Sequence, residues 1–230
     1  MRVCAVFADC EEFLTVWSVV EELRRRDVET LTVHLKRRPL PSTIFALLGF
    51  DADKTVELEG CEPAGAMAIV LRELPGILED FGAEWVVLHG GGEASVGAAI
   101  AAYYCGCRVG HIGSGLRFAA HRRPPLKEFC RRAAESLATL LAAPTKRAAE
   151  NLASENRTPE AVLLSGSTLA ESLTILKAEL QKRDDILQGM RARLGMAEVG
   201  APLLVVHVEG LSEEDSRTVL NGAGRVKAIF

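Results

Sequence analysis

Short apolar runs alternate with longer amphipathic stretches along roughly the first two thirds of the chain. The apolar runs predict strands at Val3–Phe7, Glu29–His34, Thr55–Leu58, Glu84–His89, Arg108–Ile112, Leu141–Ala143 and Ala161–Ser165. The stretches between them predict helices at Glu11–Arg26, Ile44–Leu48, Ala64–Phe81 (broken or kinked at Pro75), Ser95–Tyr104, Leu126–Leu140 and Thr145–Asn156. This alternation predicts an α/β fold, with a parallel, Rossmann-like sheet covered by helices on both faces.

The pattern changes after Gly166, where apolar residues recur at spacings of four and three, interrupted only by Arg183. They are Leu169, Leu173, Leu176, Leu180, Leu187, Met190 and Leu194. The spacing predicts one long helix, whose apolar side packs either on its own domain or along a second copy of the chain. Both alternatives stay open. An apolar strand at 202–208 and a polar helix that ends at Leu220 are expected to follow.

We therefore expect a domain at residues 1–168 and a short C-terminal helix–strand–helix segment at 169–230. The part that follows the long helix is too short for a second α/β domain, because a single βαβ unit needs about 30 residues. Its apolar strand needs cover on both faces. A homodimer in which two copies cover each other's C-terminal segments would supply that cover.

Composition and charge exclude several classes of partner. The formal net charge is −4 over 230 residues, and the basic residues form no long block, so neither nucleic acid nor a membrane surface is expected as a partner. No apolar run reaches the ~18 residues of a membrane span, and no signal peptide is readable, which favours a cytoplasmic protein. The six cysteines lack paired spacing, so we expect free thiols and no metal.

Two glycine-rich segments carry the candidate chemistry, and each follows a predicted strand. They are His89–Ser95 and Gly110–Arg117. The ends of parallel strands face the ligand crevice in such folds. Gly90, Gly91 and Gly92 leave backbone N–H groups free at a helix start, where an anion such as phosphate could bind; alternatively, the glycines only fill space. The first turn has no dinucleotide fingerprint, so no cofactor is expected.

With their neighbours, these segments resemble the UDP-N-acetylglucosamine 2-epimerase family over residues 2 to about 210. The family's His-Gly-Asp-Thr loop and Ala-rich helix correspond to His89–Tyr104, and its Val-Gly-His-Val-Glu-Ala-Gly-Leu-Arg segment corresponds to Val109–Arg117. Its Ala-Pro-Thr, Glu-Asn-Leu and Gly-Asn-Thr motifs correspond to Ala143–Thr145, Glu150–Leu152 and Gly166–Thr168. The resemblance implies the N-terminal half of a two-domain fold of the glycosyltransferase-B type, with a truncated second domain.

The sequence departs from the family where the family's chemistry lies. The first turn, Gly-Thr-Arg-Pro-Glu followed by a Lys in the family, reads Ala8-Asp9-Cys10-Glu11-Glu12 here, with Thr15 in place of the Lys. Gly91 replaces the acidic residue of the His-Gly-Asp loop, and Gly113 replaces the Glu of the second segment.

The family's Pro-Glu-Glu-x-Asn-Arg stretch is changed in part. Its first Glu is Lys127 and its Asn is Cys130, whereas its second Glu and its Arg are kept as Glu128 and Arg131. Three of the family's acidic positions have therefore lost their carboxylates. Inverting a sugar carbon through proton removal and return needs general acids and bases, which glycine does not supply.

Two hypotheses follow. The first is an epimerase-like protein that is catalytically impaired or inactive and still binds a UDP-sugar. The alternative is a non-catalytic assembly or regulatory subunit that acts with a complete epimerase or another sugar-nucleotide enzyme. The candidate catalytic residues are Glu93, His111, Glu128 and His207. The candidate ligand-binding residues are Gly90, Gly91, Gly92, Gly113, Ser114, Arg117 and Arg131.

Overall fold

The computed structural model describes residues 1–37, 40–117, 126–193 and 217–221. It contains a parallel sheet of seven strands in the order β3-β2-β1-β4-β5-β6-β7. The strands are β1 (Arg2–Phe7), β2 (Glu29–Lys36), β3 (Lys54–Glu57), β4 (Trp85–His89), β5 (Arg108–Ile112), β6 (Leu140–Ala143) and β7 (Val162–Leu164). The parallel, helix-covered α/β fold expected from the sequence is confirmed.

Helices α1 to α6 lie between these strands in the chain, as a parallel sheet requires, and α7 and α8 follow the last strand. They are α1 (Cys10–Arg25), α2 (Ser42–Leu48), α3 (Pro63–Phe81), α4 (Glu93–Tyr104), α5 (Leu126–Leu137), α6 (Lys146–Ser154), α7 (Thr168–Gln181) and α8 (Asp184–Arg193). The helix α3 is assigned as continuous through Pro75, where the sequence predicts a break or a kink.

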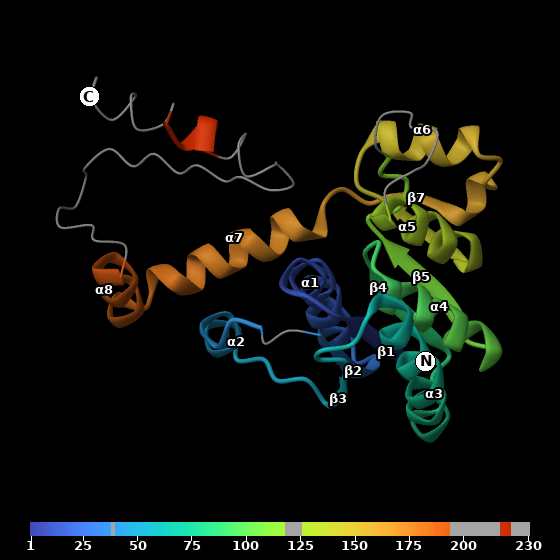
Figure 1. The fold of residues 1–230 in the computed structure, drawn as a ribbon, viewed down its shortest axis with the longest axis horizontal. Coiled ribbons are helices and arrows are strands. Elements are labelled where there is room, and N and C mark those ends of the chain that lie inside the picture. Colours follow the sequence, from blue (N-terminus) through green and yellow to red (C-terminus); the bar gives the residue numbers. More distant parts are fainter. Residues whose placement is uncertain (38–39, 118–125, 194–216, 222–230) are drawn as a thin grey trace. The chain divides into compact units, whose positions relative to one another are not determined.

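Central strand β1 is buried on both faces after its first residue. Cys4 and Val6 face the core shared with α3 and α4, whereas Ala5 and Phe7 face the side covered by α1. The two layers of helices can be followed in Figure 1, with α3 and α4 on one side of the sheet and α1 on the other. Apolar side chains in alternate directions explain why β1 reads as an unbroken apolar run.

The prediction of one long helix at 169–194 is wrong in one respect. It is two helices, because α7 ends at Gln181 and α8 begins at Asp184. The backbone N–H of Lys182 caps the end of α7 by donating to the carbonyls of Glu179 and Leu180. The leucine spacing is interrupted at the same place, because Arg183 stands where the next apolar residue would fall.

The packing of α7 shows that some of its leucines contact their own domain. Leu169 and Leu176 pack against a cluster of aromatic residues around Phe13 of α1, within one compact unit that spans residues 1–182. Residues 183–230 form a second unit, of which only α8 and residues 217–221 are described. The strand predicted at 202–208 and the candidate His207 lie outside the described residues. The domain boundary at residue 168 stays a prediction.

No helix in the described part of the chain is long and apolar enough to cross a membrane.

Candidate functional site

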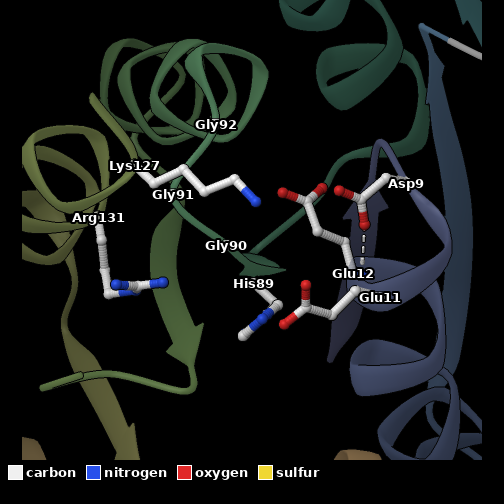
Figure 2. Close-up of a pocket in the computed structure, with 9 residues that line it drawn as sticks. All are labelled: Asp9, Glu11, Glu12, His89, Gly90, Gly91, Gly92, Lys127 and Arg131. Carbon is white, nitrogen blue, oxygen red and sulfur yellow. Dashed lines mark hydrogen bonds between the residues drawn. The ribbon is translucent and has the colours of Figure 1, made fainter. Parts of the chain in front are cut away.

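A cavity of about 200 Å³ opens at the carboxyl ends of the adjacent strands β1 and β4. It is lined by Asp9, Glu11, Glu12, His89, Gly90, Gly91, Gly92, Lys127 and Arg131 (Figure 2). The chain runs from β1 to β2 and β3 on one side and returns to β4 on the other. Such a reversal of strand order leaves a crevice between two loops, which is where open α/β sheets bind ligands.

One wall of the cavity is the acidic start of α1. Asp9 is the N-cap of this helix, and its Oδ1 accepts a hydrogen bond from the backbone N–H of Glu12 at 2.8 Å. Glu11 and Glu12 occupy the first turn. Carboxylates at a helix start are stabilised by the unpaired N–H groups and by the helix dipole, which explains why acidic residues are favoured in this turn.

Glu12 differs from its two acidic neighbours because its side chain is buried. Its Oε2 accepts a hydrogen bond from the backbone N–H of Ala8 at 2.7 Å. Burial, helped by the nearby charge of Asp9, raises the pKa of Glu12 to about 8. The Glu12 side chain is therefore mainly protonated at neutral pH.

The contacts of Ser95 agree with a protonated Glu12. Ser95 Oγ lies 3.0 Å from Glu12 Oε1 and 3.1 Å from the carbonyl oxygen of His89. Serine has one proton to donate, and a carbonyl oxygen can only accept. When the Ser95 proton goes to His89, the contact with Glu12 is a hydrogen bond only if Glu12 supplies its own proton.

His89 lines the cavity at the end of β4. Its Nδ1 lies 2.7 Å from the carbonyl oxygen of Ile112, so Nδ1 carries the proton and donates it. Burial lowers the pKa of His89, which keeps the ring neutral. The other ring nitrogen, Nε2, is therefore a hydrogen-bond acceptor.

The opposite wall is cationic and comes from α5. In Figure 2, Lys127 and Arg131 both point into the cavity from the side opposite the start of α1. Arg131 donates one hydrogen bond from Nη1 to the carbonyl oxygen of Leu116 at 3.3 Å, and its Nε is buried without a partner among the described residues. Burial lowers the pKa of Arg131. The cavity thus separates carboxylates from cations.

Gly90 and Gly91 are held by close packing. Gly90 has a φ of +108°, and a Cβ at this position would lie 2.0 Å from Glu12 Oε1. A Cβ on Gly91 would lie 2.1 Å from the backbone oxygen of Lys127. By contrast, Gly92, the N-cap of α4, has room for a Cβ. The first two glycines are therefore required by this packing, whichever ligand the loop binds.

Three of the other predicted ligand-binding residues lie outside the cavity lining. Gly113 has a φ of +74° and approaches the ring of His89, where an added Cβ would lie 2.5 Å from Cε1. Ser114 is fully buried, and its Oγ lies 2.8 Å from Nδ1 of His111. Arg117 is engaged by Glu135 and Glu155. Gly90, Gly91, Gly92 and Arg131 do line the cavity, and the binding roles of all seven residues stay predictions.

Arg117 is held in a buried ion-pair network. Its Nη2 lies 2.6 Å from Oε2 of Glu135 and 2.7 Å from Oε2 of Glu155, and its Nε donates a further bond to Glu155. Burial opposes the charge, but the hydrogen bonds from Arg117 to Glu155 and Glu135 raise the pKa of the guanidinium. Arg117 joins the segment after β5 to α5 and α6.

The predicted catalytic candidates are likewise held by neighbours. His111 Nε2 lies 3.1 Å from the carbonyl oxygen of Gly90, and burial lowers the pKa of His111 to about 3. Glu93 forms an ion pair with Arg37. Glu128 pairs with Arg132 at 2.8 Å. None of these three candidates is among the residues that line the cavity.

Sequence reasoning missed the residues of the acidic wall as site residues. In the sequence, Asp9, Glu11 and Glu12 stand out only as part of a turn that departs from the family motif, although they directly follow a buried strand. Their place after β1 was the available signal, because the first turn of a doubly wound sheet lines the crevice. No group of three or more His, Cys, Asp or Glu residues suited to hold a metal ion occurs in the described part of the chain.

Comparison with known proteins agrees with this fold. A sequence model of the family described as UDP-N-acetylglucosamine 2-epimerase matches residues 22–220. A probable UDP-N-acetylglucosamine 2-epimerase of Ralstonia nicotianae is 33% identical over 131 residues, which cover 57% of this chain and 35% of the relative. The UDP-N-acetylglucosamine 2-epimerase of Neisseria meningitidis is 28% identical over 187 residues, covering 79% of this chain and 50% of the relative.

Solved structures of such enzymes share the fold at lower identity. The UDP-GlcNAc 2-epimerase of Methanocaldococcus jannaschii superposes with a TM-score of 0.82 at 17% identity, covering 100% of this chain and 63% of that one. The Neisseria meningitidis enzyme bound to UDP-GlcNAc gives a TM-score of 0.76 at 24% identity, covering 86% of this chain and 54% of that one. The chain thus spans between about a third and a half of the curated relatives described above. Because the family model matches well over half of its residues, the chain belongs to the UDP-N-acetylglucosamine 2-epimerase family.

Proposed function

We propose that this chain binds a nucleotide sugar at the cavity between β1 and β4, and that it is impaired or inactive as a 2-epimerase. The binding half of the proposal is supported by the family and by a related structure that holds UDP-GlcNAc. It is further supported by the position of the cavity at the reversal of strand order, with Arg131 and Lys127 available to an anionic ligand.

The observation that carries the loss of activity is the packing at Gly91. The family motif has an acidic residue here, but the space for its Cβ holds the backbone oxygen of Lys127, 2.1 Å away. A carboxylate could not stand at this position unless the loop and α5 moved apart. The same argument holds at Gly113, where the ring of His89 occupies the space.

The other ionisable groups of the cavity do not replace the lost carboxylates. Asp9, Glu11 and Glu12 stand on the wall formed by α1, whereas the acidic positions that the motif has lost are Gly91, Gly113 and Lys127. The loss of one positioned acid or base costs ~10²–10⁴ in rate. Three such losses leave no measurable turnover.

The test is to incubate the full chain with UDP-N-acetylglucosamine and to analyse the sugar products by chromatography, while binding is followed by thermal shift. We expect a higher melting temperature with the nucleotide sugar, because a ligand that binds only the folded state stabilises it. We expect no manno epimer above a control without protein. The Neisseria meningitidis relative, assayed in parallel, shows that the assay detects turnover. Formation of the epimer by this chain would refute the loss of activity.

The second candidate function is assembly or regulation beside a complete epimerase or another sugar-nucleotide enzyme. It is favoured by exposed apolar side chains at the sheet edge, since Leu163 and Leu164 of the edge strand β7 are each about half exposed. Exposed sheet edges and apolar patches are common contact surfaces. Co-purification with a complete relative, and a change in that relative's rate, would support this function. A homodimer could use the same edge.

The proposal places the protein in the cytoplasm. All six cysteines are free, as expected where glutathione keeps thiols reduced. Cell fractionation tests this location.

A further inference from the structure

The cavity has two walls of opposite charge that do not pair with each other. Asp9 and Glu11 lie on one wall, and Lys127 and Arg131 on the other, and no ion pair between the walls is found among the described residues. From this arrangement we infer that the cavity selects a nucleotide sugar whose sugar carries a free, protonated amine in place of an N-acetyl group. This inference deepens the proposed function and rests on it.

The acidic wall suits an ammonium group. Asp9 lines the cavity while its Oδ1 caps α1, and the side chain of Glu11 is exposed. An ionised carboxylate can only accept hydrogen bonds, and an ammonium group is a donor of three. An acetamido group offers one N–H together with a carbonyl oxygen, which carboxylates repel. The wall therefore discriminates between the two forms of an amino sugar.

The cationic wall suits the phosphate of the same ligand. Arg131 has a buried Nε without a partner among the described residues, and Lys127 points into the cavity beside it. Charge-assisted bonds from guanidinium and ammonium groups are those that proteins use for phosphate. At about 200 Å³, the cavity is smaller than the roughly 300–1,000 Å³ pockets that enclose drug-sized ligands. It therefore has room for the sugar end of the ligand, not for a whole nucleotide sugar.

The departures from the family motif point in the same direction. The motif's Arg and Lys on the α1 side correspond to Cys10 and Thr15, and Asp9 and Glu11 have no acidic counterpart in it. On the α5 side, the motif's Glu corresponds to Lys127. Relative to the motif, the α1 wall has therefore lost two cations and gained two carboxylates, and the α5 wall has exchanged a carboxylate for a cation beside the kept Arg131.

The test compares two ligands that differ only in the acetyl group, UDP-glucosamine and UDP-N-acetylglucosamine, by isothermal titration with the full chain. We expect UDP-glucosamine to bind about tenfold more tightly, the ratio that one charge-assisted hydrogen bond supplies. Glucosamine 1-phosphate and N-acetylglucosamine 1-phosphate form a second pair without the nucleotide. A preference for the free amine in either pair supports the inference.

Substitutions test which residues cause the preference for the free amine. Asp9→Asn keeps a side-chain oxygen for the helix cap, so the double variant Asp9→Asn/Glu11→Gln removes charge with little effect on α1. It is expected to bring the affinity ratio close to one by weakening only UDP-glucosamine. Lys127→Gln is expected to weaken both nucleotide sugars by a similar factor. Glu29→Gln, at the exposed start of β2, is the matched control and keeps the wild-type ratio.

The outcomes separate this inference from the function on which it rests. Equal affinities within both pairs, or tighter binding of the N-acetylated member, overturn the inference; if the UDP-sugars bind, nucleotide-sugar binding stays in place. A preference seen only with the sugar phosphates supports the inference but counts against a nucleotide ligand. A wild-type preference that survives in the double variant overturns the assignment to Asp9 and Glu11. If none of the four compounds binds, both proposals are refuted.

Discussion

The carboxyl group of Glu12 is held almost out of contact with water, between the backbone N–H of Ala8 and the hydroxyl of Ser95. Burial, with the charge of Asp9, raises the pKa of Glu12 from its ordinary 4.5 to about 8. A folded-state pKa above the unfolded-state value means that the folded state holds its proton more tightly. This contribution to the free energy of unfolding is complete below pH 4.5 and is lost as pH rises through about 8.

Glu12→Gln should therefore remove one source of alkaline destabilisation. Glutamine keeps a carbonyl oxygen for Ala8 and an N–H donor for Ser95, and it does not ionise. We expect the melting temperature of the variant, relative to that of the wild type, to rise between pH 5 and pH 9. The difference between the two proteins cancels the titration of His89 and His111. Parallel curves over this range would show that Glu12 is not protonated in the folded state.

Gly91 and Gly92 allow a matched test of the loop packing. A Cβ on Gly91 meets the backbone oxygen of Lys127 at 2.1 Å, whereas a Cβ on Gly92 meets only Glu12 Oε1, at 3.8 Å. We expect Gly91→Ala to lower the free energy of unfolding by ~1–3 kcal/mol, the usual cost of overpacking, and Gly92→Ala to change it little. Denaturant titration measures both. Equal stability of the two variants would mean that the loop moves freely away from α5.

At the scale of elements, one buried ion-pair network joins the segment after β5 to α5 and α6. Arg117 bridges Glu135 and Glu155, and the side chain of Glu135 is only 1% exposed. Replacing Arg117 by Leu leaves the buried carboxylate of Glu135 without its cationic partner. We therefore expect a loss of ~3–5 kcal/mol in the free energy of unfolding. The double variant Arg117→Leu/Glu135→Gln should recover part of the loss. Full stability of Arg117→Leu in a denaturant titration would be inconsistent with a structural role.

The helix α7 is docked on α1 by hydrogen bonds as well as by leucines. Thr168 Oγ1 donates to the backbone oxygen of Thr15 at 2.7 Å, and Leu176 packs on the aromatic cluster around Phe13. Leu173 faces outward and is 47% exposed. We expect Leu176→Ala to cost ~1–3 kcal/mol of stability, toward the low end of the range for buried leucines, because Leu176 is half-buried. If Leu173 contacts no second copy, Leu173→Lys should leave the melting temperature unchanged; a large decrease would place Leu173 in a packed surface.

For the whole molecule, the homodimer remains a prediction, and Leu173 offers a way to test it. Light scattering of the unmodified chain is expected to give the mass of two copies. If the exposed side of α7 contributes to the contact, Leu173→Lys should give folded monomers, since a buried lysine charge disfavours association. A stable monomer at all concentrations would rule out the homodimer. A dimer that survives Leu173→Lys would place the contact elsewhere, on another part of the C-terminal segment or on the edge strand β7.

The sequence by itself predicted the order and nature of the elements within the first unit. A strand such as Val3–Phe7 and a helix such as α4 are recognisable because their hydrophobic patterns are local. The family motifs also located the loop at Gly90–Gly92, which does line the cavity. The break between α7 and α8 escaped prediction although Arg183 interrupts the leucine spacing there, because the spacing resumes at Leu187.

Only the tertiary structure decided what faces the glycine loop. The adjacency of β1 and β4, which are separated by two strands in the chain, brings Asp9, Glu11 and Glu12 to the cavity. Likewise, packing decided that Arg117 and His111 are engaged in the interior, although their sequence positions suggest a site. Strand order and side-chain pairing depend on contacts between distant residues. Local patterns predict which residues form a strand or a loop, but not which loop lies opposite.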